Sequence, residues 1–286
     1  MDMKKIIGLA ATFLLAFGAL AACGNNDKDT ADSSANSGKD GETTLVVGAS
    51  PSPHAEILEA AKPVLEKEGI KLEVKTFTDY VMPNKALAEK EIDANYFQHI
   101  PYFDKQVKEY DYDFANAGAI HIEPMGIYSK NIKSLEDIKE GTQVITSNSE
   151  SDWGRILTIL EDAGLIKLKD GVEKTTATFD DITENPKKLV FKHDIDPGVL
   201  IPTYENEADS LVAINANFVL SADMNPTKDS LLLEADNSPY ANIIAVRAGD
   251  ENKDSIKKLV AALHSDEVKK FVDEKWQGSV KIVDAN

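Results

Sequence analysis

The chain has 286 residues, of which 42% are hydrophobic, so it is long enough for one large domain or two lobes. Its 31 basic and 49 acidic side chains give a formal net charge of −18, which argues against the basic footprint of a nucleic-acid-binding protein. The single cysteine, Cys23, excludes an internal disulfide, so the fold must depend on its hydrophobic core.

The amino-terminal segment has the features of a bacterial lipoprotein signal. Two lysines precede an apolar run over 6–19, and a Leu-Ala-Ala sequence leads directly to Cys23. The run is short for a membrane span, which needs about 20 residues. We expect a signal peptide over 1–22, acylation of the Cys23 thiol, and an extracytoplasmic protein that is lipid-anchored to the cell membrane. An ordinary secretory signal or a transmembrane anchor is the alternative.

Residues 23–42 are rich in Asn, Asp, Ser and Gly, which predicts a flexible tether. A strand over 44–48, a helix with apolar residues on one face over 57–65, and an alternating strand over 70–75 then predict a βαβ unit. The same alternation continues and predicts an α/β protein with helices on both faces of mixed sheets. Further helices are expected at 84–91, 100–109, 155–163, 256–264 and 267–276, and further extended segments at 94–97, 121–129, 143–146, 189–192, 211–215 and 243–247.

Motifs for catalysis or phosphate binding are missing from the sequence. It has no Gly-x-Ser-x-Gly, no P-loop and no Gly-x-Gly-x-x-Gly, and its five histidines lack His-x-x-x-His spacing. We therefore expect a protein that is not an enzyme and has no cofactor and no bound metal. Metal delivery through His54, His99 or His121 with carboxylates is a second hypothesis, and a surface-anchored hydrolase is a third.

Five collinear segments resemble the NlpA family, the methionine-binding lipoproteins of ABC importers. They are FTDYVMPN (77–84), EIDANYFQH (91–99), AGLIKL (163–168), ITENPK (182–187) and SPYAN (238–242). The resemblance covers nearly the whole chain after the leader. It implies a two-lobed, periplasmic-binding-protein-like α/β fold with a ligand cleft between the lobes. The implied lobe 1 comprises 43–124 plus 237–286, and the implied lobe 2 comprises 125–236, a division that the sequence patterns alone do not give.

The resemblance also assigns ligand-binding residues. An arginine fork matches a carboxylate, aromatic rings suit a thioether, and asparagine amides can both accept from an ammonium and donate to a carboxylate. Arg155 is implied to hold the ligand's α-carboxylate. Surface ion pairing, core packing and strand-end turns are the structural alternatives for these residue types. The implied set is Tyr80, Phe97, His99, Arg155, Asn215, Asn217 and Asn242.

One segment departs from the family pattern. Many members carry Pro-Asn-Asp-Pro-Thr-Asn before Gly-Arg, whereas residues 147–155 read SNSESDWGR here. Asp152 replaces an asparagine and is expected to meet a ligand ammonium or to cap a helix, and Trp153 adds bulk near the carboxylate clamp. The expected ligand is L-methionine or a close relative, with another amino acid or a dipeptide as the alternative. The expected partner is an ABC transporter permease, and the protein is expected to be a monomer.

Overall fold

The computed structural model describes residues 43–235 and 238–284. The signal peptide, Cys23 and the tether, which the sequence places in 1–42, lie outside the described residues. Within the described part, no helix combines the length and the apolarity that crossing a bilayer requires.

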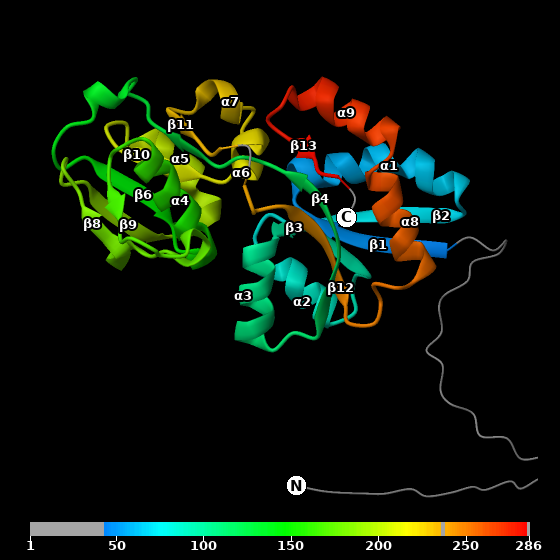
Figure 1. Cartoon of the computed structure of the whole chain (residues 1–286). Helices are drawn as coiled ribbons and strands as arrows, with labels where there is room; N and C mark the ends of the chain where they lie inside the picture. The colour runs from blue at the N-terminus through cyan, green and yellow to red at the C-terminus, as the bar shows by residue number, and fades with distance from the viewer. Residues whose placement is uncertain (1–42, 236–237, 285–286) are drawn as a thin grey trace, which may run out of the picture. The chain divides into compact units, whose positions relative to one another are not determined.

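The first sheet has six strands in the order β13-β4-β12-β3-β1-β2 (Figure 1). β1 is parallel to β2 and β3, while β12 is antiparallel to β3 and β4. Ile70 and Leu72 of β2 are buried, and the charged residues that follow each of them are exposed, as in a strand with one solvated face. The bounds are β1 Thr43–Ala49, β2 Ile70–Thr76, β3 Ala94–His99, β4 Phe114–Ile122, β12 Asn242–Arg247 and β13 Lys281–Ile282.

Helices cover both faces of the first sheet. In β12, Ile244 and Val246 pack with α1, α8 and α9, whereas Ile243 and Ala245 pack with α2 and α3. A strand that is buried on both faces needs an unbroken apolar sequence, which β12 has. The bounds are α1 Glu56–Lys67, α2 Met82–Ala88, α3 Ile100–Tyr110, α8 Asp254–Leu263 and α9 Asp266–Trp276.

The second sheet has five strands in the order β11-β5-β10-β6-β9. Val144 of β6 packs with α4 on one face, and the next residue, Ile145, packs with α5 and α6 on the other. A separate two-stranded sheet, β7 Lys167–Leu168 and β8 Ile182–Glu184, flanks this lobe. The remaining bounds are β5 Gly126–Tyr128, α4 Glu150–Asp162, β6 Gln143–Ser147, β9 Val190–Ile195, α5 Leu200–Asn206, β10 Leu211–Ile214, α6 Ala216–Ser221, α7 Pro226–Asp229 and β11 Leu232–Leu233.

The chain passes from the first sheet to the second between β4 and β5 and returns between β11 and β12. Each sheet has its own hydrophobic clusters. The expected fold class, a two-lobed α/β binding-protein fold, is therefore confirmed. The residue bounds assigned to the two lobes stay a prediction.

Two expected elements differ from the structure. The extended segment expected over 121–129 is wrong as a single element, because β4 ends at Ile122 and β5 begins at Gly126 in the other sheet. Pro124 lies between them and has no N–H to continue a strand ladder. The helix expected to start at Arg155 starts at Glu150 instead, so the arginine lies in its second turn.

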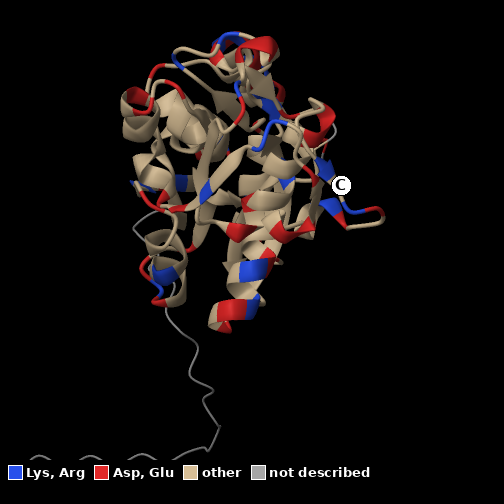
Figure 2. Ribbon diagram, turned by 90° about the vertical axis from the view of Figure 1, so that its left-hand side faces the viewer, with Lys and Arg blue, Asp and Glu red and all other residues tan. Residues whose placement is uncertain are grey.

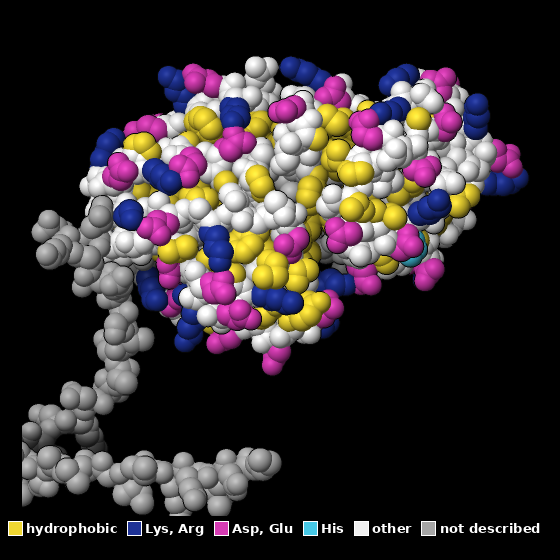
Figure 3. Space-filling view, turned by 180° about the vertical axis from the view of Figure 1, so that it is seen from behind, with side chains coloured by type: hydrophobic (Ala, Val, Ile, Leu, Met, Phe, Trp, Pro, Cys, Tyr) yellow, Lys and Arg dark blue, Asp and Glu magenta, His cyan; other side chains and the backbone are white. Residues whose placement is uncertain are grey.

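Charged residues of both signs are interspersed over the helices and loops (Figure 2). Seen from behind, hydrophobic side chains show between them (Figure 3). The most exposed large hydrophobic side chains include Tyr110, Val81 and Met82, at 54%, 49% and 47%. Exposed apolar residues among charged ones are usual for a globular surface.

Candidate functional site

One narrow cavity lies where elements of the two sheets meet. The first sheet contributes the ends of β3 and β4 and the start of β12, and the second contributes α4 and the turn from β10 into α6. The cavity measures about 20 Å³, so an amino acid can enter only if side chains or lobes move apart. The structure brings all seven sequence-predicted ligand residues to it. Its lining is Tyr80, Phe97, Gln98, His99, Tyr102, Glu123, Asp152, Arg155, Asn215, Ala216, Asn217 and Asn242.

His99 ends β3 and is the N-cap of α3. Its Nδ1 accepts a hydrogen bond from the main-chain N–H of Tyr102 at 3.1 Å, and Pro101 occupies the first turn, where a missing N–H costs nothing. Because Nδ1 accepts, Nε2 carries the hydrogen and donates to Asp152 Oδ1 at 3.0 Å. His99 therefore joins the first sheet to α4.

Asp152 is buried, and both of its oxygens have partners. Oδ1 accepts from His99, and Oδ2 accepts from Asn215 Nδ2 at 3.1 Å. Burial favours a raised pKa for Asp152. The electrostatic attraction and hydrogen bond of the His99 N–H, the charge of Arg155 and the hydrogen bond from Asn215 outweigh burial and lower the pKa to about 2. The interpretation of Asp152 as a helix cap is wrong, because Ser149 is the N-cap of α4.

Trp153 points away from the cavity. Its indole N–H donates to the main-chain oxygen of Ser147 at 2.9 Å, and its ring contacts Phe179 and His193 with centroid distances of 5.1 and 4.8 Å. The expectation that Trp153 crowds the carboxylate clamp is therefore wrong. Consecutive residues of a helix face different directions, and the site is on the side of Asp152 and Arg155.

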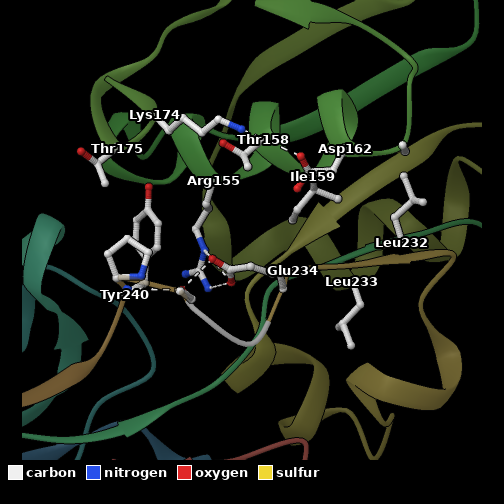
Figure 4. Close-up of a pocket in the computed structure, with 14 residues that line it drawn as sticks. Arg155, Thr158, Ile159, Asp162, Lys174, Thr175, Leu232, Leu233, Glu234 and Tyr240 are labelled. Atoms are coloured by element: carbon white, nitrogen blue, oxygen red, sulfur yellow. Dashed lines mark hydrogen bonds and ion pairs between the residues drawn. The ribbon is translucent and has the colours of Figure 1, made fainter. Parts of the chain in front are cut away.

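Arg155 is 5% exposed and is held by the second sheet and by both connections between the sheets (Figure 4). Its Nε donates to Glu234 Oε1 and Oε2 at 3.2 and 3.1 Å, and its Nη2 donates to Glu234 and, at 3.2 Å, to the main-chain oxygen of Glu123. The Tyr240 ring lies 4.4 Å from the guanidinium carbon.

Burial would lower the pKa of Arg155, but the charges of Glu234 and Asp152 outweigh burial and raise it. The guanidinium therefore stays charged. Nη1 lies 3.5 Å from Asp152, and no hydrogen bond engages Nη1 among the described residues. This nitrogen is the donor that remains for a bound carboxylate.

Arg155, Glu234 and Tyr240 also line a second cavity of about 520 Å³, which extends along α4 towards Lys174 (Figure 4). It is the larger cavity, but residues 236–237, which border it in the chain, lie outside the described part. The narrow cavity has the greater convergence of buried polar groups. Polar groups converging in a buried space are the stronger indication of a ligand site, so we take the narrow cavity as the candidate.

The aromatic and amide residues form the remaining walls. The Tyr80 hydroxyl donates to Asn217 Oδ1 at 2.7 Å, a contact between a loop of the first sheet and α6. The Tyr80 ring packs near Phe97, Tyr102 and Phe218 at centroid distances of 6.1, 5.9 and 5.3 Å. Asn215 Oδ1 is buried and has no partner among the residues that the structure describes. These rings form an apolar wall beside the polar cluster.

Sequence reasoning missed Glu123 and Glu234, and it named His54 and His121 only for a metal. His54 Nε2 and His121 Nε2 lie 3.7 and 3.9 Å from Glu123 Oε1, and His54 Nε2 donates to Asn242 Oδ1 at 3.0 Å. His99, the third histidine of that hypothesis, binds Asp152 instead. The one local signal for Glu123 was its place before Pro124, where the chain leaves the first sheet.

The comparisons with known proteins agree on one family. The model of the family described as NlpA lipoprotein matches residues 45–283. The methionine-binding lipoprotein MetQ of Bacillus subtilis (strain 168) is 47% identical over 280 residues, which cover 97% of this chain and 98% of that protein. The D-methionine-binding lipoprotein MetQ of Escherichia coli (strain K12) is 37% identical over 261 residues, covering 91% of each.

Solved structures give the same result. A pheromone cOB1 precursor/lipoprotein of the YaeC family from Enterococcus faecalis V583 is 59% identical with a TM-score of 0.82, and the match covers 84% of this chain and 100% of that one. A nutrient binding protein from Burkholderia cenocepacia bound to methionine is 42% identical with a TM-score of 0.78, again covering 84% and 100%.

Proposed function

This chain belongs to the NlpA lipoprotein family, and we propose that it is a substrate-binding lipoprotein that captures L-methionine, or a close relative, outside the cell. It delivers this ligand to the permease of an ABC transporter and catalyses no reaction itself. It acts as a monomer, anchored to the membrane by lipid on Cys23. The observation that carries the proposal is the convergence of Arg155, the asparagines and an aromatic wall on one cavity between the sheets.

The roles follow from the contacts. Arg155 binds the α-carboxylate through Nη1, since Glu234 and the Glu123 carbonyl already hold Nε and Nη2. Asn215, Asn217 and Asn242 contact the polar head, and Asn215 Oδ1 has no other partner. Tyr80, Phe97 and His99 shape the slot for the thioether, because sulfur interacts favourably with aromatic rings.

Binding is coupled to movement of the two lobes, 43–124 plus 237–286 and 125–236. The bonds of Asp152 with His99 and of Tyr80 with Asn217 join the two sheets directly. Opening breaks these bonds, and closing over the ligand makes them again. Such hinge closure about two crossovers presents the permease with a shape that the open protein lacks.

Thermal unfolding of the purified lipoprotein in detergent micelles tests the ligand class. L-methionine at 100 times its Kd should stabilise the fold by about 2.7 kcal/mol and raise the midpoint by about 5–10 °C. D-methionine, glycyl-methionine, L-leucine and a divalent cation serve as competitors. A larger rise of the unfolding midpoint with another amino acid or with the dipeptide would identify that compound, and not methionine, as the ligand. A rise with the cation alone would favour metal delivery.

A further inference from the structure

Glu123 occupies an unusual place beside the carboxylate clamp. Its main-chain oxygen accepts from Arg155 Nη2 at 3.2 Å, and its side chain lines the same narrow cavity as the arginine. In an α-amino acid the carboxylate and the ammonium are attached to one carbon. A site that binds the carboxylate at Arg155 therefore needs an acceptor for the ammonium directly beside it, and Glu123 lies there.

The two other acids near Arg155 are already committed. Both oxygens of Asp152 accept hydrogen bonds, from His99 and Asn215. Glu234 binds Arg155 with both oxygens and also accepts from the main-chain N–H of Met125 at 3.0 Å. Every oxygen of these two acids already accepts at least one hydrogen bond, so an ammonium would have to share that oxygen with an existing partner.

Glu123 differs from both, because its Oε2 is buried and has no hydrogen-bond partner within 43–235 and 238–284. The Nε2 atoms of His54 and His121 lie 3.7 and 3.9 Å from the other oxygen, Oε1, and both rings are fully buried. Buried polar atoms in native proteins are normally paired, so an unpartnered carboxyl oxygen in a binding cavity points to a ligand.

We infer that Glu123 recognises the ligand's ammonium group, with Oε2 accepting an N–H while Oε1 stays beside the buried rings of His54 and His121. The inference rests on the proposed function and adds a specificity residue to it. Arg155 then binds the carboxylate of the zwitterion and Glu123 binds its ammonium. A carboxylic acid without an α-amino group lacks the contact with Glu123.

The same cluster has to be distinguished from a metal site. One ligand atom each from His54, His121 and Glu123 lies within 4.8 Å of the others. However, Asn242 Oδ1 can only accept, so the His54 Nε2 that contacts it carries a hydrogen and has no lone pair for a metal. The Tyr96 hydroxyl already engages His121 Nδ1. His121 Nε2 and Glu123 would then be the ligands left near each other, fewer than the three or four of a typical zinc site, so the contacts favour a hydrogen-bonded ammonium over a bare cation.

Recognition of the ammonium by Glu123 should change the protonation of its carboxyl group. Burial raises the pKa of Glu123 to about 8, with the charge of Arg155 opposing and that of Asp152 adding to the rise. Burial lowers the pKa of His54 to about 4 and that of His121 well below its usual range, so both rings are neutral at pH 7. The phenols of Tyr80 and Tyr96, whose pKa values burial raises, complete the titratable groups around the carboxyl.

Glu123 is therefore mostly protonated at pH 7 before the ligand arrives. An ammonium beside it favours the carboxylate, so the carboxyl proton leaves to the buffer as the ligand binds. Binding of L-methionine at pH 7 should release about one proton, and the affinity should rise by up to about tenfold per pH unit below pH 8.

Calorimetric titration of the full-length lipoprotein in detergent, at pH 7 in phosphate and in Tris, measures the released proton from the difference in heats. The parent should release about one proton with L-methionine. Glu123→Gln should release none and bind about 30-fold or more weakly. The control Glu140→Gln removes an exposed carboxylate that pairs with Lys188 in the second lobe, and it should match the parent.

A second ligand separates charge recognition from loss of folding. 4-(Methylthio)butanoate keeps the carboxylate and thioether but lacks the ammonium, so parent and Glu123→Gln should bind it within about twofold. In the parent alone, this analogue should bind without the released proton. That comparison still tests the inference if the variant fails to fold.

The outcomes are distinct. If the parent binds no amino acid, the proposed function fails and the inference fails with it. If the parent binds L-methionine without releasing a proton and Glu123→Gln binds equally well, the inference is overturned while the proposed function remains. Loss of parent binding in EDTA, restored by a divalent cation, also overturns it, because the cluster would then hold a metal.

Discussion

The two sides of the cavity differ in how their polar groups are satisfied. On the side of the second sheet, Arg155 and Asp152 are charged and paired. On the side of the first sheet, His54, His121 and Glu123 each leave a buried atom without a partner in the described part of the chain, and burial favours their neutral forms. One side is therefore organised in advance for a negative charge, while the other gains its partner and its charge when a ligand binds.

Removal of the Arg155 guanidinium should have the largest effect of the variants on both stability and ligand binding. Arg155→Ala leaves Glu234 and Asp152 buried without their cation, so we expect about 3–5 kcal/mol less stability and a loss of L-methionine binding of several kcal/mol. Chemical denaturation and calorimetry measure the two effects. Arg155→Lys keeps the charge without the fork and should fall between parent and alanine variant. Binding by Arg155→Ala as tight as the parent's would exclude Arg155 as the clamp.

The charge of Asp152, on the side of the second sheet, should make the unfolding free energy depend on pH. Its pKa of about 2 lies below the ordinary value of 3.8, so its stabilisation is present above pH 4 and is lost as the pH falls through 2. The difference in unfolding free energy between parent and Asp152→Asn should therefore shrink by roughly 2 kcal/mol between pH 4 and pH 2. A difference that stays constant over this range would contradict the role of the ionised carboxylate.

A contact between the two sides should have a smaller effect. Tyr80→Phe keeps the ring but removes the hydroxyl that donates to Asn217 at 2.7 Å. We expect about 1 kcal/mol weaker ligand binding, measured by calorimetry, because the closed form loses one hydrogen bond. Tyr110→Phe, which removes an exposed hydroxyl from the same lobe, is the control. Equal loss in both variants would show that the effect is not specific to the cavity.

The smallest effect is expected at Trp153, the most conspicuous departure from the family pattern. Its ring packs on Phe179 and His193, away from the cavity. Trp153→Phe should change the affinity for L-methionine by less than about twofold, while stability falls by about 1 kcal/mol through the lost indole hydrogen bond. A tenfold change in affinity would mean that Trp153 reaches the ligand after all.

Periodicity predicted much of the fold, but it failed where polar residues are buried. The first turn of α4, Glu150 to Gly154, has no apolar face, so its helix was expected five residues late. The split between β4 and β5 was missed because Glu123-Pro124 interrupts an otherwise continuous extended pattern. Local sequence does not reveal which sheet an extended segment joins.

The candidate site was predictable only in part, and for a physical reason. Arg155 and the asparagines came from the family resemblance, since an arginine among 49 acidic residues has many alternative partners. Neither the family resemblance nor the sequence pattern assigned Glu123 to the site. Its neighbours His54 and Asn242 are distant in sequence, and only the fold brings them together. A buried acid cannot be told from an exposed one until its surroundings are known.

Calorimetric titration of the full-length parent with L-methionine, after unfolding and refolding to remove any ligand carried through purification, tests directly whether the cavity binds an amino acid. We predict saturable one-to-one binding at micromolar concentration or below. Absence of heat with L-methionine, D-methionine, other amino acids and methionine dipeptides alike would contradict it, because the cavity built around Arg155 would then not be an amino-acid site.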